Sequence, residues 1–146
     1  MLTIAMMVRV GPWTVRAIDI VREPEHCERC DTVIKEVWVC EVDADAKQLA
    51  TLDGKRVWRI GNDCGPRLMS LAQDRWDDDS REVRMRLQRA KRYFALREVA
   101  NAKSYELPSN LVECGEALLN GTLDRGSLKY FGLVMTDHEK ALKLRK

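Results

Sequence analysis

The chain has 146 residues, of which 45% are hydrophobic and 33% are charged. This length and balance fit one ordinary domain, or a small metal module joined to a helical partner, and they exclude two large independent cores and disorder along the whole chain. Because 25 basic residues nearly balance 23 acidic ones, any attraction to nucleic acid has to come from local clusters of charge.

No apolar run reaches the length of a membrane span, and the first ten residues lack the basic flank and the cleavage site of a signal peptide. We therefore expect a soluble protein with no membrane partner. The chain has five cysteines, an odd number, and two of them form a Cys-x-x-Cys pair. This pattern favours metal binding in a reducing compartment over a disulfide framework, so we expect a cytoplasmic location.

The first sixty residues are rich in β-branched and aromatic side chains, which are typical of strands. The clearest strand segments are residues 7–10, 13–18, 37–40 and 57–60. Gly11-Pro12 separates the first two segments, and Asp53-Gly54 predicts a turn shortly before the fourth. These signals predict an antiparallel sheet.

Three cysteines have the spacing of a zinc site. Cys27 and Cys30 lie two residues apart, so a tight turn brings both sulfurs to the same side, where they can bind one ion. Cys64 follows the strand segment 57–60 at the start of a predicted helix, where free amides and the helix dipole favour a thiolate. A thioredoxin-like redox pair does not fit, because Pro24 precedes the pair and a strand follows it. We predict one structural zinc ion held by these three cysteines.

The fourth ligand is open. The arrangement of a knuckle, a hairpin and a helix-start cysteine resembles a treble-clef zinc finger, whose second helix ligand would fall on Arg67 in this chain. Cys40, at the end of segment 37–40, is the favoured replacement because it is the softest donor. His26, beside the cysteine pair, and Asp63, beside Cys64, are the alternatives, and Cys40 is equally compatible with a buried core thiol.

Helices follow the sheet. Pro66 suits a first helical turn, and apolar residues then recur at helical spacing as far as Trp76. We interpret Asp77-Asp78-Asp79-Ser80 as an acidic break that caps a longer helix from about Ser80 to Tyr105. Two further helices are predicted over 110–119, ended by Asn120-Gly121, and from 125 to the C-terminus.

The predicted fold class is α+β, with a small zinc-stapled antiparallel sheet in the N-terminal half and helices in the C-terminal half. Residues 1–76 would form a zinc-binding, β-rich module that ends in a helix. Residues 77–146 would form a helical region packed on that module within one compact domain.

A resemblance covers about residues 25–70. The matching strings are Cys27-x-x-Cys30, Ile34-x-x-Val37-Trp38-Val39, Asp53-Gly54-Lys55 and Ile60-Gly61-Asn62-Asp63-Cys64-Gly65. Together they resemble small uncharacterised zinc-binding proteins of bacteriophages and other mobile elements. The resemblance implies a zinc-stapled hairpin and a phage or plasmid origin in a bacterial host cytoplasm, with no activity attached.

The long helix carries a cluster of basic residues. On a helical projection they spread across the face opposite Val83, Leu87, Ala90 and Phe94. The candidate binding residues are Arg81, Arg84, Arg89, Lys91 and Arg92. Such a stripe can contact phosphates or an acidic protein surface, or it can be only a solvated face. In each case we expect the combined change of Arg84, Arg89 and Arg92 to Ala to leave folding nearly intact.

Four tryptophans also admit a binding role, because rings exposed on a sheet can stack on unpaired bases. They are Trp13, Trp38, Trp58 and Trp76. Trp38 and Trp58 each lie in a short β-branched segment near the cysteines, so we expect both to be core residues of the zinc module.

No nucleophile-and-base motif or Gly-rich phosphate loop is present, and thiolate ligands suit structural zinc better than catalytic zinc, so we do not expect an enzyme. The favoured function is a non-enzymatic, zinc-stabilised binding protein that contacts nucleic acid through the basic helix. The alternative is a phage-encoded inhibitor, of the anti-CRISPR or another counter-defence type, that docks on a host protein or nucleoprotein complex. That alternative rests on small size, on the resemblance, and on Tyr93 lying among arginines, a composition common at interfaces.

Overall fold

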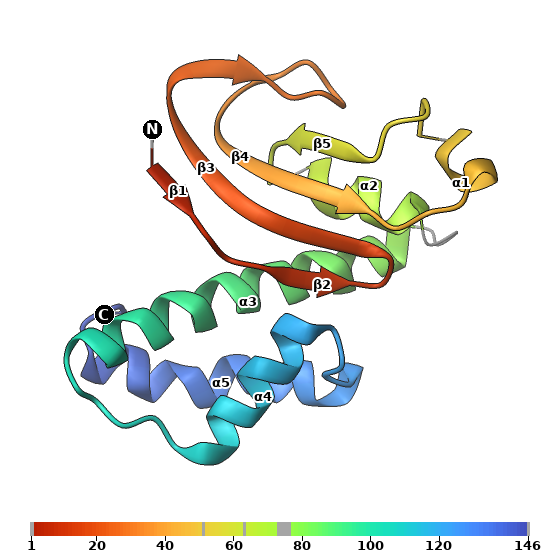
Figure 1. Ribbon diagram of the computed structural model, residues 1–146. Helices are drawn as coiled ribbons and strands as arrows, with labels where there is room; N and C mark the ends of the chain where they lie inside the picture. The colour runs from red at the N-terminus through yellow and green to blue at the C-terminus, as the bar shows by residue number, and fades with distance from the viewer. Residues whose placement is uncertain (1, 51, 63, 73–76, 146) are drawn as a thin grey trace. The chain divides into compact units, whose positions relative to one another are not determined.

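The computed structural model describes residues 2–50, 52–62, 64–72 and 77–145. A five-stranded sheet occupies the N-terminal half and helices occupy the C-terminal half, which confirms the predicted α+β class (Figure 1). The chain divides into two compact units, Met1–Arg84 and Met85–Lys146, called here the N-terminal and the C-terminal unit. The boundary falls within one long helix.

The strands pair antiparallel throughout. They are β1 (Leu2–Ile4), β2 (Val8–Val10), β3 (Trp13–His26), β4 (Val33–Val42) and β5 (Val57–Ile60). The order is β1-β3-β4-β5, and β2 pairs with a different stretch of β3 from the one that β1 pairs with. Each of the four predicted segments overlaps one of these strands, and β3 and β4 extend beyond the segments 13–18 and 37–40. The strand β1 precedes these segments and was not among them, and Ala5, Met6 and Met7 separate it from β2.

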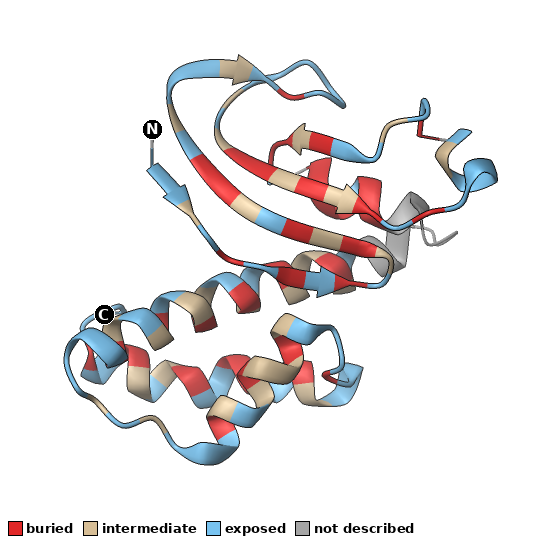
Figure 2. Ribbon diagram, in the orientation of Figure 1, coloured by how far each residue is buried: buried red, intermediate tan, exposed pale blue. Residues whose placement is uncertain are grey.

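Successive side chains along a strand point to opposite faces of the sheet. One face of this sheet is buried. Two cross-strand rows run through β3, β4 and β5 on that face, Val15–Cys40–Trp58 and Ile18–Trp38–Ile60. All six residues are buried, and Figure 2 shows buried segments along these strands. The core role expected for Trp38 and Trp58 is confirmed, since their side chains are 4% and 7% exposed. Trp76 lies outside the described residues.

The other face carries an ion network centred on Arg59 of β5. Its guanidinium binds the Asp19 carboxylate at 3.0 Å and the Glu25 carboxylate at 2.8 Å, and both acids belong to β3. Thr3 of β1 donates to the other oxygen of Asp19 at 2.9 Å. The network therefore connects the first and last strands of the sheet through β3, and the hydrogen bond from Arg59 lowers the pKa of Glu25.

The helices are α1 (Ala46–Ala50), α2 (Cys64–Ala72), α3 (Asp77–Ala102), α4 (Ser109–Asn120) and α5 (Arg125–Ala141). The short helix α1 was not expected. Asp45 caps it by accepting from the Gln48 amide at 2.8 Å, while the Gln48 side chain accepts from the Asp45 amide at 3.1 Å. This reciprocal pair is a capping box, and Asp45-x-x-Gln48 was its signal in the sequence.

Helix boundaries were partly predicted. The long helix begins at Asp77, so the interpretation of residues 77–80 as a break before the helix was wrong. The predicted stop of α4 is confirmed, because Gly121 adopts a left-handed φ of 78° after Asn120.

Inside the C-terminal unit, α3 contributes Tyr93, which is fully buried. A Cβ added to Gly115 of α4 would collide with the Tyr93 ring, so only glycine allows this close approach. The Tyr93 hydroxyl donates to a carboxylate oxygen of Glu116 at 2.9 Å. The same Glu116 oxygen also accepts a hydrogen bond from the Arg97 guanidinium at 2.9 Å. The expectation that Tyr93 belongs to an exposed interface was therefore wrong, because its ring packs against α4.

Candidate metal centre

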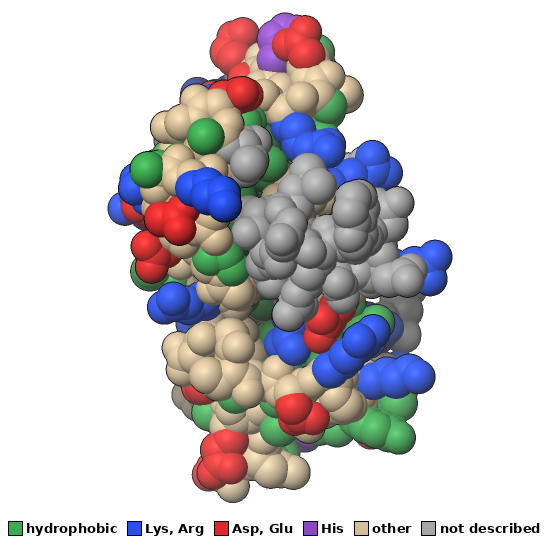
Figure 3. Space-filling view, turned by 90° about the vertical axis from the view of Figure 1, so that its right-hand side faces the viewer, with side chains coloured by type: hydrophobic (Ala, Val, Ile, Leu, Met, Phe, Trp, Pro, Cys, Tyr) green, Lys and Arg blue, Asp and Glu red, His purple; other side chains and the backbone are tan. Residues whose placement is uncertain are grey.

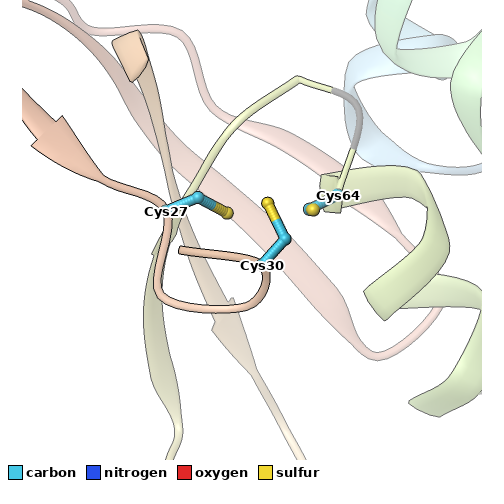
Figure 4. Close-up of side chains that lie close together, drawn as sticks. All are labelled: Cys27, Cys30 and Cys64. Atoms are coloured by element: carbon cyan, nitrogen blue, oxygen red, sulfur yellow. The ribbon is translucent and has the colours of Figure 1, made fainter. Parts of the chain in front are cut away.

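The three predicted cysteines lie together. The sulfurs of Cys27, Cys30 and Cys64 are all within 4.8 Å of one another, so the three residues could hold a metal ion (Figure 4). Four thiolates around a tetrahedral zinc ion, with bonds of about 2.3 Å, are separated by about 3.8 Å. The limit of 4.8 Å on the sulfur–sulfur distances is compatible with ligation of one ion, which would draw the sulfurs to about that separation.

A tight turn after β3 positions the first two cysteines. The Asp31 amide donates to the Cys27 carbonyl at 2.8 Å, and the Cys27 amide donates to the Thr32 carbonyl at 2.8 Å. Asp31 adopts a left-handed φ of 63°, which an aspartate tolerates better than most residues. These bonds reverse the chain within a few residues, so both sulfurs of the Cys-x-x-Cys pair face the same side.

Backbone and side-chain bonds attach this turn to β5. The Glu28 amide donates to the Arg59 carbonyl at 3.1 Å, and the Glu28 carboxylate accepts from the Arg59 amide and from the Lys55 ammonium, the latter at 2.7 Å. Because β5 leads directly towards Cys64, docking the turn on β5 brings the third cysteine near the other two.

Gly61 and Gly65 fix the start of α2. The Gly65 amide donates to the Gly61 carbonyl at 3.0 Å, which places Cys64 in the first turn of the helix. A Cβ added to Gly61 would lie 3.2 Å from the Cγ2 of Ile34, a tight contact with β4. A larger residue at position 61 would thus push the segment that carries Cys64 away from the sheet.

The thiols differ in their electrostatic surroundings. Cys30 is exposed, and its hydrogen bonds with Thr32 lower its pKa to about 7. Burial raises the pKa of Cys64 to about 11, partly offset by Arg29, whose guanidinium lies 3.7 Å from the Cys64 sulfur. A bound cation would favour the thiolate at all three positions, and Arg29 adds a positive charge beside the resulting anionic site.

The other candidate ligands are placed elsewhere or lie outside the described residues. Cys40 is fully buried in β4 between Val15 and Trp58, and burial raises the pKa of its thiol. His26 is beside the turn, but its Nδ1 lies 2.9 Å from the Asp31 carbonyl oxygen and the residue is not in the cluster. Asp63 is outside the described residues. Within the described part of the chain, no further Cys, His, Asp or Glu joins the three cysteines.

Two residues of the predicted basic stripe lie against α5. The Arg92 guanidinium donates to the Gly132 carbonyl at 3.0 Å and to both carboxylate oxygens of Glu139, which is 5% exposed. A Cβ added to Gly132 would lie 2.9 Å from the guanidinium of Arg89. Burial lowers the pKa of Arg89. Neither guanidinium therefore belongs to a fully solvated face.

The signal for this placement was in the sequence. Arg89 shares a helical row with Tyr93 and Leu96, at positions i, i+4 and i+7, and both of these residues are buried. The predicted apolar face, Val83, Leu87, Ala90 and Phe94, left out this row and therefore missed the burial around Arg89.

The remaining basic residues of the stripe share one helical row of α3. Arg81 and Lys91 are exposed and Arg84 is half-buried, and exposed Gln88 lies between them on the same helical row. In the view of Figure 3, Lys and Arg side chains are visible together with Asp and Glu side chains.

No protein-family model, curated protein or solved structure matches the chain. The resemblance to phage and mobile-element proteins therefore stays a prediction. None of the described helices combines the length and the apolar character that crossing a membrane would require.

Proposed function

We propose that the protein is a non-enzymatic binding protein whose N-terminal unit is stabilised by one zinc ion. The observation that carries this proposal is the convergence of Cys27, Cys30 and Cys64 within 4.8 Å. Soft thiolates favour zinc over harder cations, and sites made mainly of thiolates are typically structural. The residues present fit such an ion, because all three donors come from segments held by backbone hydrogen bonds.

The ion would link parts of the N-terminal unit that are far apart in sequence. Cys27 and Cys30 belong to the turn between β3 and β4, whereas Cys64 begins α2. Few apolar contacts are available at an exposed turn such as this one, so metal ligation would supply much of the free energy that holds it to the helix.

The proposed binding surface is the helical row of α3 that contains Arg81, Arg84 and Lys91, which would contact phosphates. Lys91 follows Arg81 by ten residues, so the first and last of these side chains are about 15 Å apart along the helix axis at the standard rise. Each phosphate neutralised by such a side chain releases condensed counterions, which favours binding at low salt. Arg89 and Arg92, which contact α5, are left out of this surface.

The test is a titration of fluorescently labelled DNA and RNA at several salt concentrations. The parent protein should bind at low salt, and the combined change of Arg81, Arg84 and Lys91 to Ala should weaken binding and reduce the salt slope by about 0.7 to 0.9 for each phosphate that is no longer neutralised. The matched control removes the same charge from exposed residues elsewhere, by changing Arg22, Lys35 and Lys47 to Ala. Equally weakened binding in the two variants, or no binding by the parent protein at low salt, would contradict the proposed surface.

A further inference from the structure

Helix α5 has apolar side chains on two sides. Leu128, Phe131 and Met135 are buried within the C-terminal unit. On the opposite side, Tyr130 is 68% exposed, Leu133 is 71% exposed and Val134 is 45% exposed. Their spacing of three and four residues places them in one stripe along the helix, called here the outer stripe. Large apolar residues gathered in this way typically mark an interaction surface.

The charges that flank the outer stripe are arranged symmetrically. Lys129 and Asp137 are both exposed, and each is four residues from Leu133, one before it and one after it. Neither makes an ion pair within the described residues. Two charges of opposite sign thus flank Leu133 at equal distances along the helix.

This arrangement is complementary to itself. If two copies of α5 pack antiparallel about a two-fold axis at Leu133, each Lys129 lies opposite Asp137 of the partner subunit. The same axis places Lys140 opposite a glycine, Gly126 of the partner subunit, so no like charges oppose each other. A two-fold interface requires this property, because the same patch must fit itself.

We propose that the outer stripe of α5 is a self-association surface, with a second copy of this chain as its occupant. The opposite charges favour a second copy over nucleic acid, which would need a consistently basic surface. One pair of helices buries less area than the 1,200 to 2,000 Å² or so of a standard stable interface, so the dimer should be reversible. This inference is independent of the zinc ion and of the proposed phosphate contacts.

The first test measures association by sedimentation of the full-length protein over a wide range of concentrations. The parent should show a concentration-dependent monomer–dimer equilibrium, and Leu133→Glu should lower the association constant by about tenfold or more, since it places a charge at the centre of the interface. Val33→Glu is the matched control, because Val33 is 57% exposed but lies in β4. Far-UV circular dichroism checks that both variants keep their helices.

A charge exchange tests the geometry. Lys129→Glu and Asp137→Lys should each weaken association, since each places like charges opposite each other, and the double variant should restore it because the exchanged charges pair again. A parent protein that sediments as a monomer at every concentration would overturn the proposal. So would unchanged association in Leu133→Glu, or a double variant that associates no better than the single ones.

Discussion

The three cysteines of the cluster have different environments although their sulfurs are neighbours. Cys27 and Cys64 are buried, whereas Cys30 is exposed at the tip of the turn. Arg29, between the two cysteines of the turn, reaches Cys64 with its guanidinium. A cluster of this kind assembles only when the turn, β5 and the start of α2 are all in place, so metal binding and folding of the N-terminal unit should be linked.

Substitution of single cysteines distinguishes cysteines that bind the metal from cysteines that only pack in the core. Cys64→Ser should lower the bound zinc and destabilise the N-terminal unit, because a neutral hydroxyl is a much weaker zinc ligand than a thiolate. Cys40→Ala should keep the bound zinc and cost only packing, because Cys40 is placed between Val15 and Trp58 and outside the cluster. Zinc content and urea unfolding measured on both variants check this. Loss of the metal in Cys40→Ala would identify Cys40 as the fourth ligand instead.

The ion network on the sheet predicts a pH dependence. Arg59 holds the pKa of Glu25 below its ordinary value of 4.5, so the folded state favours the ionised carboxylate. The resulting stability is fully present above the unfolded pKa and is lost as the pH falls through the lower folded pKa. The effect should be under about 1 kcal/mol, since the pair is partly exposed.

The measurement is the free energy of unfolding at neutral pH and below about pH 4, where carboxylates titrate. Glu25→Gln should lower stability at neutral pH and lose part of the acid sensitivity, whereas Glu23→Gln, at an exposed position of β3, should change neither. Identical pH profiles for the parent and Glu25→Gln would show that the Arg59 pair contributes nothing measurable.

At the scale of whole elements, α3 shows which features of a helix a helical projection of its sequence predicts and which it misses. Of the four residues expected on the apolar face, Val83, Leu87 and Ala90 are buried and Phe94 is half-buried. The basic residues were expected to be dispensable for folding, yet Arg92 pairs with buried Glu139 of α5. A pattern on one helix shows which side is apolar, but it does not show which charged residues at the edge of that side meet a partner on another helix.

Arg92→Ala should therefore destabilise the protein. Removal of the guanidinium leaves the buried Glu139 carboxylate with the longer contact to Arg145, at 3.5 Å, as its ion pair among the described residues. Breaking a buried pair in this way typically costs about 3 to 5 kcal/mol. Gln88→Ala, at an exposed position of the same helix, should change stability by less than about 0.5 kcal/mol. Urea unfolding of the two variants measures the difference. Similar stabilities would mean that the Arg92–Glu139 pair contributes little.

The parts of the structure that depend on local sequence signals could be predicted. The strand over 57–60, the stop at Gly121 and the cysteine trio all depend on short-range chemistry, and the structure bears them out. The length of β3 was not predictable from alternation alone, since its pairing with β4 shifts register between Ile20 and Glu25, where the strand contains Pro24. The surroundings of Arg89 depend on Gly132, which is far away in sequence, and single-helix patterns carry no such information.

At the scale of the whole molecule, the chain consists of two compact units, and the cysteine cluster belongs entirely to the first. The core of the C-terminal unit includes apolar side chains from α3, α4 and α5 and contains none of the three cysteines. Removing the metal should therefore unfold structure in the N-terminal unit, while helices of the C-terminal unit persist.

The most direct test of the central claim is the zinc content of freshly purified protein, measured by elemental analysis and followed by treatment with a chelator. We expect one zinc ion per chain. We also expect the chelator to remove the ion together with the near-UV signal of the buried tryptophans Trp13, Trp38 and Trp58. Much of the helical far-UV signal should remain. Protein that contains no zinc, and whose spectra are unchanged by added zinc or by the chelator, would contradict the account.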